Sequence, residues 1–132
     1  MALAASPAMP ASPGQVQLHD LLRVCRTGDH VTDALLKEML GLFIADNGRR
    51  IDLARQAARS GDHLALRGAV HAIKGSAALI GATRLRDLAG DLELRVVSGT
   101  ARNAESATEI MREEFAAVVK TLHSLYPDIS AA

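Results

Sequence analysis

Residues 63–80 read HLALRGAVHAIKGSAALI, and this stretch decides the fold class. One set of its apolar residues returns at steps of three or four, which is the spacing of one helix face. They are Leu66, Val70, Ile73, Ala77 and Ile80. Asp62 is a suitable N-cap and Gly81 a suitable terminator for this helix. The stretch therefore predicts an amphipathic helix with one buried face.

The segments on either side repeat the pattern, so we expect helix after helix. The expected helices cover 15–26, a segment from Asp29 or Thr32 to Phe43, 51–60, 84–97 with Thr83 as N-cap, and a last helix from Asn103 or Ser106 to Tyr126. Asn47-Gly48 predicts a break or kink. No segment alternates with period two, so no strand is predicted. The pattern indicates an all-α fold, an antiparallel four-helix bundle with an additional short N-terminal helix or helices.

The composition fits one globular domain. The chain has 132 residues, of which 48% are hydrophobic and 23% charged, and aromatic residues make up only 2%. Residues 1–14 are mostly Ala, Ser and Pro and carry no charge, so we expect a disordered tail or linker there. The helical domain is expected to span 15–127, with its core at about 30–126.

The charge balance, the single cysteine and the N-terminal residues argue against several classes of protein. Fifteen basic and fifteen acidic residues cancel, which argues against a nucleic-acid binder. Cys25 is the only cysteine, so no intramolecular disulfide can form. The N-terminal residues lack the basic region of a signal peptide, and no apolar run approaches the ~20 residues of a membrane span. We expect a soluble, cytoplasmic monomer that binds no membrane.

His71 does not fit the packing of its helix. It lies well away from the buried stripe, and its same-face neighbours are Arg67, Gly68, Lys74, Gly75 and Ala78. Each glycine inside a helix costs ~1 kcal/mol relative to alanine, so two beside one histidine need a reason. Missing side chains would let another protein reach the imidazole.

The chemistry of this group points to phosphoryl transfer. Imidazole is a competent nucleophile, and near neutral pH a free ring has an unprotonated nitrogen. Phosphoryl transfer needs positioning and neutralisation of charge, which a lysine three residues further on can help to supply.

The segment from His71 to Ala82 resembles the histidine phosphotransfer (HPt) domains of bacterial phosphorelays. That family has His, two residues, Lys-Gly, often Ser, and then Gly-Ala before a helix with leucines and a Leu-Glu pair. Here these residues are His71, Lys74, Gly75, Ser76, Gly81-Ala82, Leu85, Leu88 and Leu92-Glu93. The upstream Gly61-Asp62, Leu64, Ala65 and Ala69-Val70 are also similar, and the resemblance covers roughly 30–125.

The resemblance implies a four-helix bundle in which an exposed His71 is phosphorylated on its solvent-facing ring nitrogen. It implies that Lys74 steadies the phosphate and that Gly75 leaves room for the receiver. We expect Arg67, Gly68, Gly75 and Ala78 to serve partner access and docking. The implied partners are response-regulator receiver domains and a hybrid sensor histidine kinase. The receiver would bring its own Mg²⁺, so the chain is expected to need no cofactor or metal site and to be a phosphocarrier rather than an enzyme.

We considered three other functional hypotheses for this sequence. A kinase dimerisation helix typically has an acidic residue directly after its histidine, whereas Ala72 stands here, and no glycine-rich nucleotide loop is present. A metal site is disfavoured because His63 and His71 are too far apart to chelate from one helix. A helical interaction module that binds a receiver domain without carrying phosphate remains the alternative.

Overall fold

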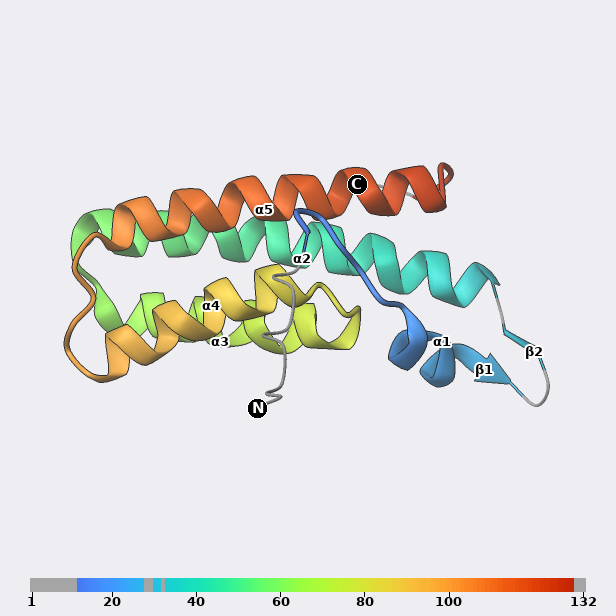
Figure 1. The fold of residues 1–132 in the computed structure, drawn as a ribbon, viewed down its shortest axis with the longest axis horizontal. Coiled ribbons are helices and arrows are strands. Elements are labelled where there is room, and N and C mark those ends of the chain that lie inside the picture. Colours follow the sequence, from blue (N-terminus) through green and yellow to red (C-terminus); the bar gives the residue numbers. More distant parts are fainter. Residues whose placement is uncertain (1–11, 28–29, 32, 130–132) are drawn as a thin grey trace, which may run out of the picture.

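The computed structural model, which describes residues 12–27, 30–31 and 33–129, confirms the helical bundle. Four long helices form it: α2 (Asp33–Ser60), α3 (His63–Leu79), α4 (Thr83–Val97) and α5 (Ala104–Leu125). Helices α2–α3, α3–α4, α4–α5 and α2–α5 are in contact, so each long helix has two neighbours and the bundle closes on itself (Figure 1). The short α1 (His19–Cys25) lies against α2 at one end.

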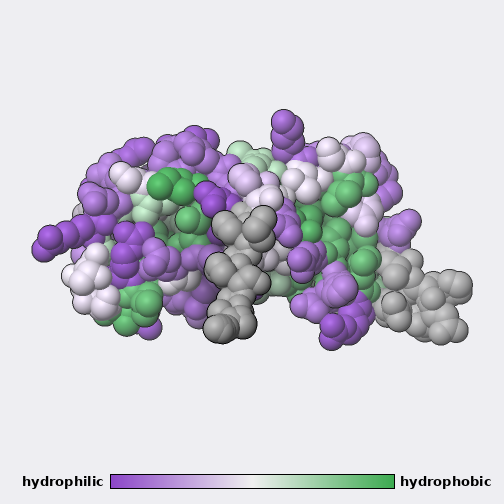
Figure 2. Space-filling view, in the orientation of Figure 1, coloured by the Kyte–Doolittle hydropathy of each residue, from purple (hydrophilic) through white to green (hydrophobic). Residues whose placement is uncertain are grey.

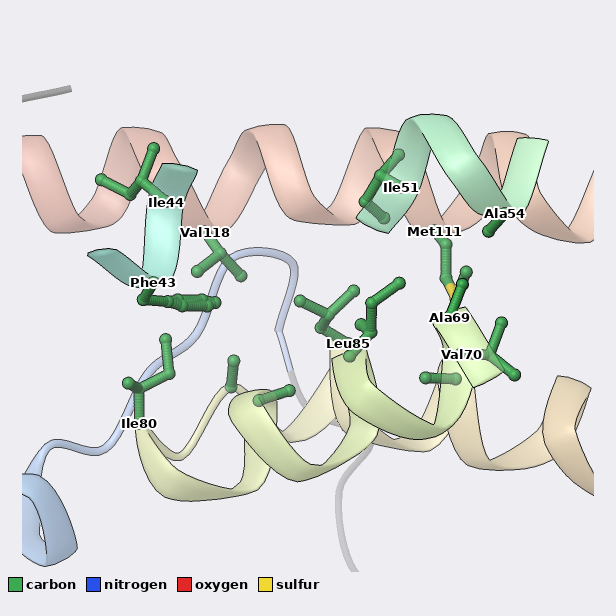
Figure 3. Packing of buried hydrophobic residues seen from close by; sticks show 14 of the residues in the cluster. Phe43, Ile44, Ile51, Ala54, Ala69, Val70, Ile80, Leu85, Met111 and Val118 are labelled. Carbon is green, nitrogen blue, oxygen red and sulfur yellow. The ribbon is translucent and has the colours of Figure 1, made fainter. Parts of the chain in front are cut away.

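The core is formed by apolar side chains that all four long helices direct inward. Phe43 of α2, Val70 of α3, Leu85 of α4 and Val118 of α5 are among the residues that line it along its length (Figure 3). The stripe predicted on the residue 63–80 helix is buried along its whole length. On the face shown in Figure 2, hydrophobic residues form separate patches between charged ones. None of the described helices has the length and apolarity to cross a membrane.

The predicted break at Asn47-Gly48 is wrong, because α2 runs through it without interruption. Asn47 is fully buried, and its amide Nδ2 donates to the Phe43 carbonyl one turn earlier at 2.9 Å. A Cβ on Gly48 would lie 3.9 Å from the Phe115 ring of α5. The Asn-Gly pair therefore packs against neighbouring groups, and this burial overrides its local preference for a turn.

The structure describes the N-terminal segment from Ser12 on, and the first helix is shorter than predicted. Gly14 is buried, and its N–H donates to the Glu114 carboxylate of α5 at 2.8 Å. The Gln17 N–H donates to the carbonyls of Ile80 and Gly81 at 3.1 Å each. These contacts fasten residues 12–17, a strap with a turn at Gly14, and α1 begins only at His19. The rest of the expected tail, 1–11, lies outside the described residues.

Two very short strands, β1 (Arg26–Thr27) and β2 (His30–Val31), pair antiparallel, although no strand was predicted. Two residues per strand are too few for period-two alternation to register. Asp29 and Thr32, the two predicted starts of the second helix, lie outside the described residues.

Of the two predicted N-caps, the one of α3 is confirmed and the one of α4 is wrong. Asp62 does cap α3, since its Oδ1 accepts from the Ala65 N–H at 3.1 Å. Thr83 is not the cap of α4. Ala82 holds that position, and the Thr83 hydroxyl donates instead to the Gly81 carbonyl at 3.3 Å. The α4 backbone begins one residue earlier than predicted, which places Thr83 inside the helix. Asn103 precedes α5 directly, as one of the two predicted starts required.

Candidate functional site

His71 lies in the middle of α3 and faces solvent. Its side chain is 69% exposed, whereas the flanking stripe residues Val70 and Ile73 are fully buried. The helical rotation of about 100° per residue produces this contrast. Within the described part of the chain, Nε2 of the ring forms no hydrogen bond, so an outside group can reach it.

Glu93 of α4 contacts both His71 and Lys74 of α3. Its Oε2 lies 2.6 Å from His71 Nδ1, and its Oε1 accepts a hydrogen bond from Lys74 Nζ at 2.6 Å. The Glu93 side chain is only 14% exposed, so its contact with Lys74 is partly shielded from water, whereas its contact with His71 is exposed. One carboxylate therefore holds the histidine ring and the lysine ammonium at once.

The charge of Glu93 determines which ring nitrogen is free. The hydrogen bond from Lys74 lowers the pKa of the Glu93 carboxyl, burial opposes this, and the bond with His71 lowers the pKa further. The carboxyl is thus ionised at neutral pH and can only accept hydrogen bonds. The proton of a neutral His71 ring is therefore on Nδ1, which leaves the lone pair of Nε2 directed away from Glu93.

The lysine has space because α4 carries a glycine opposite it. A Cβ on Gly90 would lie 3.3 Å from Cδ of Lys74, closer than most such contacts. The aliphatic part of Lys74 therefore runs over a position that has no side chain. Gly90 and Glu93 were not predicted as site residues from the sequence. Glu93 appeared only in the Leu-Glu pair of the family pattern, and no local signal shows which α4 residue lies opposite His71.

The two glycines beside His71 have no packing role inside the molecule. Gly68 and Gly75 are exposed, and a Cβ on either would meet no atom within 4 Å. Ala78 is exposed as well. The absence of these side chains is therefore not required by the core. Without these side chains, the surface of α3 around the imidazole carries no bulky group and is accessible.

The predicted site residues divide into two groups. His71, Arg67 and Gly68 line one open hollow of about 310 Å³ together with Leu64 and Glu93. Lys74, Gly75 and Ala78 belong to the same helix but do not line this hollow. Lys74 is oriented toward Glu93 rather than standing free beside the ring. In the described ranges, no three His, Cys, Asp or Glu side chains gather as a metal site would require.

A comparison with protein-family models matches residues 38–126 to the Hpt domain. The chain belongs to the Hpt domain family. Neither a curated protein nor a solved structure matches it. The Hpt match includes nearly all of α2 and the whole of α3, α4 and α5, and so contains His71, Lys74 and Glu93. The strap, α1 and the short strands precede it. Hpt domains act in histidine phosphotransfer in phosphorelays, together with receiver domains and kinases.

Proposed function

We propose that this Hpt domain accepts a phosphoryl group on His71 from the aspartyl phosphate of a receiver domain. It then passes the group to the aspartate of another response regulator. The observation that carries the proposal is the exposed ring of His71, whose Nδ1 is bound by an ionised carboxylate while Nε2 has no partner among the described residues.

The transfer step follows from this arrangement. The Nε2 lone pair attacks phosphorus and forms the N–P bond. The P–O bond of the acyl phosphate breaks, and its electron pair goes to the departing aspartate carboxylate. The proton stays on Nδ1, where Glu93 balances the positive charge that develops on the ring. The reverse sequence delivers the group to the next receiver.

The exposed surface supports a carrier that works with partners. Gly68 and Gly75 leave the approach to the ring open, and Leu64, at 81% exposure, offers an apolar contact at the rim. In this proposal the receiver supplies Mg²⁺ for the aspartate side of the reaction. A hybrid sensor histidine kinase supplies the phosphoryl group in the first place, and this chain neither generates nor hydrolyses it.

Phosphotransfer from a panel of phosphorylated receiver domains tests the proposal. We expect acid-labile, alkali-stable label on the wild type and none on His71→Gln. His63→Gln is the matched control, because His63 is an exposed histidine of the same helix that does not line the hollow. Label on His63→Gln but not on His71→Gln establishes the acceptor. A folded wild type that takes no label from any receiver contradicts the proposal and favours the interaction module.

A further inference from the structure

The two cations that flank His71 have different surroundings. Lys74 Nζ is held by Glu93 at 2.6 Å, and its side chain passes over Gly90 of α4. Arg67 is exposed, and among the described residues it forms no salt bridge. The lysine thus already has an anionic partner, whereas the guanidinium of Arg67 is available to an arriving anion.

Arg67 also shares the space into which the ring of His71 opens. Side chains in an α-helix lean toward the N-terminus of the helix, so the imidazole lies over the turn that contains Arg67 and Gly68. The hollow of about 310 Å³ agrees with this neighbourhood, because Lys74 does not line it. Its lining residues are Leu64, Arg67, Gly68, His71 and Glu93. Gly68 adds no side chain that would fill it.

We propose that Arg67 is the residue that binds the oxygen atoms of the phosphoryl group on His71 Nε2, whereas Lys74 acts on the ring through Glu93. This inference rests on the proposed function. A guanidinium presents paired N–H donors that match two oxygens of one phosphoryl group. If Lys74 turned to the phosphoryl group, the largely buried carboxylate of Glu93 would lose its strongest partner beside a second anion.

The test uses phosphoramidate as the donor, so that no receiver domain is required. The Nε2 lone pair attacks phosphorus, the P–N bond of phosphoramidate breaks, and ammonia leaves with the electron pair. Wild type, Arg67→Gln, Arg67→Lys and Lys74→Ala are compared with Arg59→Gln. Arg59 is an exposed arginine of α2 that does not line the hollow, so it controls for loss of one positive charge.

The main readout is the ³¹P resonance of phosphohistidine as a function of pH. A bound guanidinium favours the dianionic phosphoryl group, so Arg67→Gln should raise the titration midpoint by roughly 0.5 pH units. We expect Arg67→Lys to restore part of this difference and Arg59→Gln to leave the midpoint unchanged. Phosphorylation by phosphoramidate should slow by about threefold in Arg67→Gln.

Three results would overturn the inference, and they can be told apart. A wild type that takes no phosphate refutes the proposed function and the role of Arg67 together. A labelled Arg67→Gln that titrates like the wild type refutes only the role of Arg67. A midpoint that moves in Lys74→Ala but not in Arg67→Gln assigns the phosphoryl group to the lysine.

Discussion

Glu93 of α4 and His71 of α3 are joined by a 2.6 Å contact between Oε2 and Nδ1, across 22 positions of sequence. The same carboxylate binds Lys74, which lowers its pKa and keeps it an acceptor. Glu93 is therefore a positioning residue for the histidine. It orients the ring and assigns the proton to Nδ1, while Nε2 forms no hydrogen bond among the described residues.

The first prediction concerns the tautomer of His71. Glu93→Ala removes the acceptor at Nδ1, so we expect the ring proton to move in part to Nε2 and phosphorylation to slow by about tenfold. Nitrogen-15 NMR of the ring reports the tautomer directly. Glu113→Ala, a change at an exposed carboxylate of α5, is the control and should alter neither quantity. An unchanged tautomer in Glu93→Ala contradicts the positioning role.

The second prediction concerns Lys74→Ala. The hydrogen bond from Lys74 is the largest cause of the lowered pKa of Glu93, so this pKa should rise toward its ordinary value. Transfer should weaken, while the free energy of unfolding changes by about 1 kcal/mol or less because the lysine is 40% exposed. Carbon-13 NMR of the Glu93 carboxyl measures the titration.

Lys37→Ala is the matched control for that experiment. Lys37 forms a similar lysine–carboxylate pair with Asp128 at 2.7 Å, and it lowers the pKa of that carboxyl. Its removal should raise the Asp128 pKa without affecting phosphotransfer. If Lys74→Ala loses melting temperature but transfers phosphate normally, the assigned role of Lys74 is wrong.

The third prediction is a loss of stability at acid pH. The pKa of Glu93 lies below its ordinary value of 4.5 in the folded chain, so the unfolded chain binds more protons between the two values. The stability due to Glu93 is fully present above the ordinary value and is lost as pH falls through the folded-state pKa. Urea unfolding from about pH 7 to about pH 3 should show the gap between wild type and Glu93→Gln closing in that window. A gap independent of pH would refute the linkage.

The fourth prediction separates stability from access at Gly75. A side chain at this position meets no atom of the chain, so Gly75→Ala should stabilise α3 by roughly 0.5–1 kcal/mol. Gly75→Leu should also fold but slow transfer from a receiver by about tenfold, because the leucine occupies the approach to His71. Thermal unfolding and transfer rates measure the two effects.

Gly48→Ala provides the comparison for Gly75, since it adds the same methyl group to α2 at an ordinary distance from Phe115. We expect a gain in stability with an unchanged transfer rate. Normal transfer in Gly75→Leu would show that the receiver does not approach over this glycine.

The fifth prediction concerns the N-terminal strap. Gly81 has φ +67, and a Cβ there would lie 2.2 Å from the Gln17 carbonyl oxygen. Gly81→Ala should therefore destabilise the fold by more than the ~1–2 kcal/mol of a left-handed alanine and should speed amide exchange at Gln17. Gly61→Ala has the same backbone strain at φ +72 but no neighbour within 4 Å, so it isolates the strain alone. Equal losses in both variants would mean that the strap contributes nothing.

The helices and the exposure of His71 could be predicted because both depend on local spacing. A residue one position after the buried Val70 must turn about 100° from the core, whichever helices form that core. The cap at Asp62 is local in the same way, since its oxygen reaches an N–H three residues later. The predicted break at Asn47-Gly48 was wrong because the turn preference of this pair is local, whereas its packing is not. Asn47 is buried in the bundle, and Gly48 lies against Phe115 of α5.

Local periodicity therefore establishes which side of α3 is buried and that His71, Arg67, Gly68 and Gly75 share the open side. The sequence contains no comparable signal for the register between α3 and α4. That register places Glu93 opposite His71 and Lys74 and places Gly90 under the lysine chain. It results from the packing of the whole bundle and the length of the α3–α4 turn. This register alone decides which ring nitrogen of His71 is bound by a carboxylate and which is not.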